Sequence, residues 1–168
     1  MGNAAIYPGT FDPVTNGHMD LITRTLSVFN RVIVAVAVNP GKRPLFTTAE
    51  RVDMLEKATA LHGLKNVSIE YFDNLLVDYC AQKKIYTVVR GLRAVSDFEY
   101  ELQLSQMNRK INKNVEAVFM MPSEEYNFIS SKIIKEVSAL GGDISELVPP
   151  PVAKALKAKY AVLKRKKK

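Results

Sequence analysis

The most restrictive feature of the sequence is residues 31–38, Arg-Val-Ile-Val-Ala-Val-Ala-Val, which are apolar after the first residue and rich in β-branched side chains. Strands of parallel sheets have this composition because helices cover both of their faces. Asn39-Pro40-Gly41 then ends the run with residues that favour a turn. The run therefore predicts a central parallel strand.

Segments with the patterns of strands and helices alternate along the rest of the chain. Apolar runs predict four further strands, one ending at residue 6 and the others at residues 67–72, 86–90 and 115–120. Apolar spacing and capping signals predict helices at about residues 18–29, 47–61, 74–84, 96–111, 130–140, 143–147 and from 149 onward. This alternation predicts an α/β fold, a doubly wound, Rossmann-like sheet of five parallel strands with helices on both faces and a C-terminal helix.

Composition narrows the class of protein further. The chain has 168 residues, of which 47% are hydrophobic and 24% charged, as in ordinary soluble globular proteins. No apolar run approaches the roughly 18 residues of a membrane helix, and the N-terminus lacks the pattern of a signal peptide. Cys80 is the only cysteine, so we expect a cytoplasmic protein without intrachain disulfides.

The net charge of +7 is concentrated at the C-terminus. Residues 154–168 hold eight basic residues and no acidic one, so the rest of the chain has a net charge of −1. A nucleic-acid surface is normally a patch on the folded domain. We therefore expect a single domain over residues 1–168 that ends, from about residue 161, in a mobile basic tail. Neither a membrane nor a specific nucleic acid is an expected partner.

Residues 7–18, Tyr-Pro-Gly-Thr-Phe-Asp-Pro-Val-Thr-Asn-Gly-His, join the first predicted strand to the first predicted helix. Gly9 predicts a tight turn and Asp12-Pro13 a second one, which places His18 in the first helical turn. Open α/β sheets bind ligands at the carboxyl ends of their strands, and a helix N-terminus suits a phosphate. His18 is therefore a candidate for phosphate binding, although a single histidine here is more often a local capping residue.

Other polar residues also follow the predicted strands. Thr10 and His18 follow the first strand, Lys42 the second, Arg90 and Arg93 the fourth, and residues 126–131 the fifth. Cations and hydroxyl donors suit polyanions and the transfer of phosphoryl or nucleotidyl groups. The sequence has no Cys/His cluster for zinc, no close carboxylate pair for hydrolysis, and neither a phosphate loop nor a dinucleotide fingerprint. No metal-ligating residue is expected.

Three stretches carry a specific resemblance. Residues 15–18, Thr-Asn-Gly-His, resemble the (His/Thr)-x-Gly-His signature of the nucleotidyltransferase superfamily. The whole stretch 7–18, together with residues 90–101, Arg-Gly-Leu-Arg-Ala-Val-Ser-Asp-Phe-Glu-Tyr-Glu, and residues 128–131, Phe-Ile-Ser-Ser, is similar to bacterial phosphopantetheine adenylyltransferases. The likeness extends over about residues 5–158. It implies that ATP and 4′-phosphopantetheine are joined to give dephospho-coenzyme A and pyrophosphate, the penultimate step of coenzyme A synthesis.

The resemblance implies a role for each matching residue. The catalytic set is His18, Lys42, Thr10 and Arg93. The residues that bind phosphopantetheine are Thr10, Lys42, Leu76 and Arg90. The residues that bind ATP are Thr10, Phe11, His18, Gly91, Leu92, Arg93, Glu101, Tyr126, Asn127, Phe128, Ile129, Ser130, Ser131 and Lys132. The acceptor phosphate would attack the α-phosphorus of ATP in line, while His18 stabilises the transition state through a hydrogen bond to the α-phosphate.

The same resemblance implies a cofactor and partners, and this sequence departs from the family pattern at two positions. It implies Mg²⁺ held mainly by the ATP phosphates, a homohexamer, and inhibition by coenzyme A. Asn127 and Lys132 stand where many relatives carry serine, and Lys132 adds a cation where the helix dipole disfavours one. From the sequence, Lys132 either touches the triphosphate or points to solvent.

Two other functions fit parts of the pattern. One is a related transferase with a different acceptor, such as a cytidylyltransferase for a phosphorylated alcohol or a nicotinate-nucleotide adenylyltransferase. The other is a non-catalytic module that binds nucleotides or RNA through the basic tail. Deletion of residues 164–168 separates the second from an enzyme, because an electrostatic binder loses affinity with its tail and an enzyme keeps its activity.

Overall fold

The computed structural model describes residues 3–39, 41, 43–93 and 95–165 of the chain, without the side chains of residues 95–97. Five parallel strands form one sheet in the order β3-β2-β1-β4-β5. The strands are β1 (Ala4–Gly9), β2 (Arg31–Ala37), β3 (Val67–Phe72), β4 (Thr87–Gly91) and β5 (Glu116–Met120). The expected doubly wound sheet is confirmed, with its switch of direction between β1 and β4.

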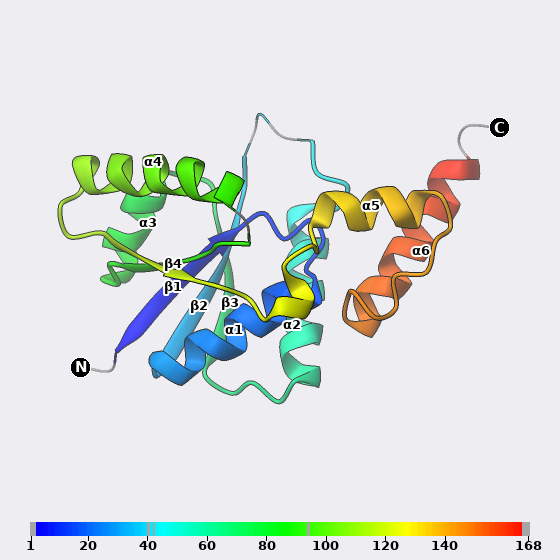
Figure 1. The fold of residues 1–168 in the computed structure, drawn as a ribbon, viewed down its shortest axis with the longest axis horizontal. Coiled ribbons are helices and arrows are strands. Elements are labelled where there is room, and N and C mark those ends of the chain that lie inside the picture. Colours follow the sequence, from blue (N-terminus) through cyan, green and yellow to red (C-terminus); the bar gives the residue numbers. More distant parts are fainter. Residues whose placement is uncertain (1–2, 40, 42, 94, 166–168) are drawn as a thin grey trace.

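In the described residues, four α-helices connect the strands, and one short 3₁₀ segment and two further α-helices follow the last strand. They are α1 (Asn16–Val28), α2 (Thr48–Leu61), α3 (Leu76–Lys83), α4 (Val95–Ile111), η1 (Glu124–Tyr126), α5 (Ser131–Ala139) and α6 (Pro150–Arg165). Helices α1 and α2 cover one face of the sheet, and α3 and α4 cover the other (Figure 1). Helices α5 and α6 pack against each other beyond the carboxyl ends of the strands, where α6 also contacts α2 (Figure 1).

The strands divide their apolar side chains between two cores because successive residues point to opposite faces. On β1, Ala5 and Tyr7 belong to the larger core under α1, α2, α5 and α6, whereas Ile6 belongs to the smaller core under α3. On β2, Val34 and Ile33 divide in the same way. The continuous apolar run that opened the sequence analysis is thus buried on both faces, as its composition predicts.

The boundaries of several elements differ from the expectations. The predicted helix at residues 143–147 is wrong, because these residues form turns that are closed by a bond from the Leu147 N–H to the Ile144 carbonyl. Helix α4 begins at Val95, one residue before the serine expected as its N-cap. Helix α3 begins at Leu76 after an N-cap residue, Leu75, that makes no side-chain capping bond, so Asn74 does not start it.

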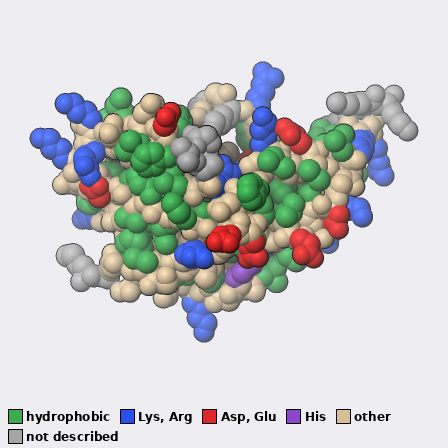
Figure 2. Space-filling model, viewed as in Figure 1, with side chains coloured by type: hydrophobic (Ala, Val, Ile, Leu, Met, Phe, Trp, Pro, Cys, Tyr) green, Lys and Arg blue, Asp and Glu red, His purple; other side chains and the backbone are tan. Residues whose placement is uncertain are grey.

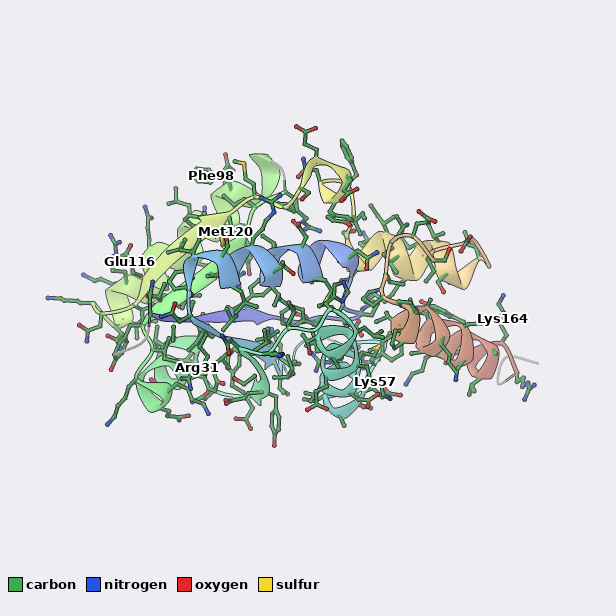
Figure 3. The ribbon with its side chains drawn as sticks, turned by 90° about the horizontal axis from the view of Figure 1, so that it is seen from below. Arg31, Lys57, Phe98, Glu116, Met120 and Lys164 are labelled. Atoms are coloured by element: carbon green, nitrogen blue, oxygen red, sulfur yellow. The ribbon has the colours of Figure 1, made fainter. Side chains whose placement is uncertain are left out.

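The C-terminal helix reaches farther than the amphipathic pattern alone indicates. Helix α6 continues to Arg165, so the first part of the expected tail, residues 161–165, is helical. Lys164 lies at the opposite end of the molecule from Glu116, the first residue of β5 (Figure 3). Within the described residues, no helix is both long and apolar enough to cross a bilayer.

A pair of leucines on α2 tests how strongly the larger core stabilises this fold. Leu55 is fully buried, whereas Leu61 on the same helix is 63% exposed. We expect Leu55→Ala to lower the free energy of unfolding by about 2–5 kcal/mol because it leaves a cavity. Leu61→Ala should change it by less than about 0.5 kcal/mol. Urea denaturation measures both, and equal losses would contradict this assignment of the core.

Candidate active site

A cleft of about 560 Å³ opens at the carboxyl ends of β1 and β4, where the strand order switches direction. Ligands of open α/β sheets bind at this kind of position because the loops diverge there. Figure 2 shows a hollow in the upper middle of one face, with lysine or arginine side chains beside it. The residues that line the cleft come from β1 and its following loop, α1, the loop before α2, β4 and its following loop, α4, the segment between β5 and α5, and the start of α5.

Most of the residues predicted from the resemblance meet in this cleft. The predicted residues that line it are Thr10, Phe11, His18, Arg90, Gly91, Arg93, Glu101, Tyr126, Ile129, Ser130, Ser131 and Lys132. Leu92, Asn127 and Phe128 are not among the lining residues, and the Phe128 side chain is 88% exposed. Leu76 is also absent from the lining and packs against the smaller core. Lys42 lies outside the described residues.

His18 has a capping role as well as a place in the cleft. Thr15 is the N-cap of α1, and its backbone N–H donates to His18 Nδ1 at 3.0 Å, which completes a capping box. A backbone amide can only donate, so Nδ1 accepts and the proton of the neutral ring lies on Nε2. The local capping role that the sequence left open is therefore real. It fixes the tautomer and leaves an Nε2–H donor for another partner.

The surroundings of His18 favour the neutral ring. Burial, and secondly the positive charge of Arg93, lower the pKa of His18 from its ordinary value of 6.5 to about 4. The Phe11 ring packs edge-on against the imidazole, with 5.1 Å between ring centroids. At neutral pH, His18 is therefore an uncharged hydrogen-bond donor rather than a cation or a proton shuttle.

Phe11 occupies an unusual backbone conformation that brings its ring over β1. Its φ angle is +49°, in the left-handed region. The ring also packs edge-on against Tyr7, with 5.4 Å between centroids, and a Cβ atom on Gly9 would lie only 2.8 Å from it. The tight turn expected at Gly9 is wrong, because Gly9 ends β1 without a positive φ. The glycine instead allows the Phe11 ring to approach the strand closely.

Arg90 and Glu101, which were assigned to different substrates, form a bidentate ion pair. Arg90 Nε and Nη2 donate to the two carboxylate oxygens of Glu101, both at 2.6 Å. Arg90 Nη1 also donates to the Pro8 carbonyl at 3.2 Å. The pair links the end of β4 to α4 and to β1, so the cation stands in the cleft in a fixed orientation.

The start of α5 is held by a local capping bond and by two bonds to other parts of the cleft. Ser130 caps the helix by accepting the Ile133 N–H at 3.2 Å, as the sequence predicts. Ser131 Oγ donates to the Pro13 carbonyl at 2.8 Å, and Arg93 Nη1 donates to the Ile129 carbonyl at 3.0 Å. The N-terminus of α5 therefore points its amide groups into a cationic cleft, an arrangement that favours phosphate.

Asp12 holds this side of the cleft together, a role that sequence reasoning missed. Its side chain is 4% exposed and accepts the backbone N–H groups of Leu45 and Phe46 at 3.0 and 2.9 Å. It also accepts a bond from Lys135 Nζ at 2.5 Å. Lys135 and Arg43 line the cleft too, although neither was predicted. Lys135 is one helical turn after Ser131, and this spacing was the available signal.

Arg51 is a second unpredicted residue, buried beneath the cleft. It is 2% exposed, and its Nη1 donates to the carbonyls of Thr10 at 2.7 Å and Ala37 at 3.1 Å. Its Nη2 donates to Thr48 Oγ1 at 3.1 Å. The loops after β1 and β2 are thus tied to α2 by one guanidinium. A lone arginine in a helix gives no sequence signal for this role.

The chemistry of the cleft suits a polyanion. Its lining contains Arg43, Arg90, Arg93, Lys132 and Lys135 but only two carboxylates, Asp12 and Glu101, both of which are in ion pairs. Within the described part of the chain, no group of three or more His, Cys, Asp or Glu side chains could hold a metal ion.

Comparison with known proteins agrees with this geometry. A family described as cytidylyltransferase-like matches residues 6–137. A phosphopantetheine adenylyltransferase of Thermodesulfovibrio yellowstonii is 51% identical over 161 residues, 95% of this chain and 99% of that protein. A protein of the same name from Hahella chejuensis is 51% identical over 162 residues, 96% of this chain and 99% of that protein.

Solved structures share the fold at lower identity. A putative nicotinate-nucleotide adenylyltransferase from Vibrio parahaemolyticus aligns with a TM-score of 0.70 and 21% identity over 95% of this chain and 96% of that one. A bifunctional NMN adenylyltransferase/ADP ribose pyrophosphatase from Francisella tularensis aligns with a TM-score of 0.68 and 16% identity over 97% of this chain and 52% of that one. These two structures establish a common fold.

The lowered pKa of His18 predicts how the free energy of unfolding depends on pH. In His18→Asn, the side-chain amide oxygen can take the place of Nδ1 as acceptor for the Thr15 N–H, but the side chain cannot titrate. Below pH 6.5 the unfolded chain binds a proton on His18 before the folded protein does, so acid destabilises the wild type. Between pH 7.5 and 4, we expect the wild type to lose about 3 kcal/mol of unfolding free energy relative to His18→Asn. Chemical denaturation across this range measures the difference, and parallel curves would contradict it.

Proposed function

We infer that this chain, which belongs to the cytidylyltransferase-like family and within it to the phosphopantetheine adenylyltransferases, transfers the adenylyl group of ATP to 4′-phosphopantetheine. The products are dephospho-coenzyme A and pyrophosphate. The observation that carries this inference is the meeting of Thr10, His18, Arg90 and Ser130 in one cationic cleft at the switch point of the sheet.

We propose a direct transfer without a covalent enzyme intermediate. An oxygen of the acceptor phosphate attacks the α-phosphorus of ATP, and the bond from that phosphorus to the oxygen bridging to the β-phosphate breaks. The attacking oxygen and the leaving oxygen lie in line, so catalysis consists of positioning and charge stabilisation. Cys80, the single thiol, is buried in the smaller core and does not line the cleft.

His18 supports the transferring group by donating a hydrogen bond. Its Nδ1 is engaged by the Thr15 N–H, so Nε2–H is the free donor, and it is available at neutral pH because the ring is uncharged. A donor fixed before the reaction stabilises the charge that grows on the α-phosphate without any reorganisation. The capping box therefore sets the orientation of the catalytic donor.

The other residues bind the acceptor phosphate and the leaving phosphates of ATP. Thr10 and Arg90, at the ends of β1 and β4, would hold the acceptor phosphate. Arg93, Ser130 and Ser131, beside the N-terminus of α5, would hold the β- and γ-phosphates of ATP. We retain Lys42 as a further cation for the acceptor phosphate on the resemblance alone.

We propose Mg²⁺ as the cofactor, held by the ATP phosphates. The cleft supports this assignment because its cations and hydroxyl donors suit the phosphates, while its two carboxylates, Asp12 and Glu101, are paired with cations. A phosphate-bound Mg²⁺ neutralises part of the charge on the triphosphate. The chain's own contribution is the surrounding set of cations and amide donors.

Three further properties belong to the proposal. We propose a homohexamer, inhibition by coenzyme A, and a cytoplasmic location. The assembly has support in α4, which exposes apolar side chains that include Phe98, Tyr100, Met107 and Ile111. Phe98 lies at the start of α4, on the same side of the molecule as Met120 (Figure 3). Light scattering of the purified protein gives its mass, and a monomer would contradict the hexamer.

The decisive experiment measures pyrophosphate release from ATP and Mg²⁺ with and without 4′-phosphopantetheine. We expect release only when phosphopantetheine is present, with dephospho-coenzyme A as the second product. Release that requires nicotinate mononucleotide, or that requires CTP in place of ATP, would keep the class of transferase and replace the acceptor or donor. No release with any acceptor would overturn the enzymatic function.

A variant tests the role of His18 in the same assay. His18→Asn keeps the acceptor for the Thr15 N–H but loses the outward Nε2–H. We expect turnover to fall about a hundredfold or more, since one lost oxyanion donor costs about 3–4 kcal/mol, while the ATP dissociation constant changes little. The wild-type rate should show no His18 titration between pH 6 and 8, because the pKa of His18 lies near 4. Wild-type turnover in the variant would remove His18 from the mechanism.

A further inference from the structure

A second groove, of about 580 Å³, adjoins the active-site cleft. It runs between α5, α6 and the loop that precedes α2. The residues that line it are Arg43, Pro44, Leu45, Lys132, Lys135, Glu136, Ala139, Lys159, Tyr160 and Leu163. Nothing in the adenylyl transfer proposed above uses this groove.

The groove is continuous with the cleft. Arg43, Pro44, Lys132 and Lys135 line both of them. Lys132 and Lys135 lie one helical turn apart near the start of α5, so they form the boundary between the two spaces. Lys132, whose direction the sequence did not decide, therefore faces a space that extends beyond the triphosphate-binding end of the cleft.

The lining of the groove carries more positive than negative side chains. Four cations line it, Arg43, Lys132, Lys135 and Lys159, against one carboxylate, Glu136. Lys135 is paired with Asp12, and Lys159 Nζ donates to the Glu50 carboxylate at 2.8 and 2.9 Å. In the described part of the chain, no carboxylate lies within ion-pair distance of Arg43 or Lys132. An anion entering from the cleft therefore meets two unneutralised cations first.

The geometry of in-line transfer places the groove relative to the phosphates of ATP. This placement rests on the function proposed above. The leaving phosphates must point away from the acceptor phosphate. The acceptor phosphate is assigned to the ends of β1 and β4, and the leaving phosphates to the N-terminus of α5. The groove borders the cleft at Lys132 and Lys135, within the first two turns of α5, so it lies next to the end of the cleft assigned to the leaving phosphates.

We propose that this groove is an oligophosphate subsite that receives phosphates beyond the γ-phosphate of the adenylyl donor. The enzyme then uses adenosine 5′-tetraphosphate as well as ATP. The acceptor phosphate oxygen forms the new bond to the α-phosphorus, the α–β bridging bond breaks, and tripolyphosphate leaves with the electron pair of that bond. No oxidant or further reactant is needed.

The test compares the two donors in variants of the groove. The quantity measured is the ratio of kcat/KM for adenosine 5′-tetraphosphate to kcat/KM for ATP, with 4′-phosphopantetheine and Mg²⁺ in excess. Lys159→Met removes a cation at the far end and should lower this ratio by about two- to fivefold, the size typical of exposed charge pairs. Glu136→Gln removes the only carboxylate of the lining and should raise the ratio by a similar factor.

A third variant is the matched control. Lys157→Met removes the same charge from the same helix, but Lys157 is exposed and does not line the groove, so the ratio should stay at the wild-type value. Thermal unfolding verifies that each variant folds, and Glu136→Gln remains informative if Lys159→Met is unstable. Two results would overturn the subsite. One is a donor ratio in Glu136→Gln that equals the wild-type ratio. The other is a donor ratio in Lys157→Met that falls as far as it does in Lys159→Met.

The reverse reaction gives an independent readout. Tripolyphosphate in place of pyrophosphate should react with dephospho-coenzyme A to give adenosine 5′-tetraphosphate and 4′-phosphopantetheine. Wild-type activity with ATP and pyrophosphate but none with the longer phosphates would overturn the subsite while leaving the proposed function intact. Absence of activity with ATP itself would instead remove the proposed function.

Discussion

Two inward-pointing charged side chains, Asp12 and Arg51, hold together the loops at the carboxyl edge of the sheet. Asp12 joins the loop after β1 to the segment before α2 and to Lys135 of α5, while Arg51 joins Thr10 and Ala37 to α2. Buried charges are costly unless hydrogen-bonded, and nearly all the polar atoms of these two side chains are satisfied, with only Arg51 Nε lacking a bond in the described residues. Removal of either side chain would release several segments of the site at once.

His18 shows how a single residue can cap a helix and line the cleft at the same time. The capping bond at Nδ1 is a local requirement of α1, yet it decides which nitrogen carries the proton. Burial, to which the Phe11 ring contributes, and the nearby Arg93 then keep the ring neutral. A histidine that served only as a cap would not need a position on the wall of a cationic cleft.

The parts of the structure that depend on local pattern were predictable from the sequence. The strand at residues 67–72 and the helix at about residues 47–61 appear where the pattern places them. Asp12 and Lys135 were not predicted, since they meet across 123 positions of sequence and only tertiary packing brings them together. The helix expected at residues 143–147 failed because so short a segment gains little from helical bonds. Its backbone instead accepts bonds from Asn16, through the carbonyls of Glu146 and Leu147.

The ion pair between Arg90 and Glu101 determines whether the Arg90 side chain loses its conformational entropy on folding or on ligand binding. A free arginine side chain loses roughly 2 kcal/mol of rotamer entropy when it is immobilised. Here bonds to Glu101 and to the Pro8 carbonyl immobilise the Arg90 side chain within the fold, so this loss of entropy is part of folding. The carboxylate also screens the guanidinium from small anions in solution. A phosphate at Arg90 must therefore bring additional contacts elsewhere in the cleft to compete, so the site as proposed favours a large, multiply anchored acceptor over inorganic phosphate.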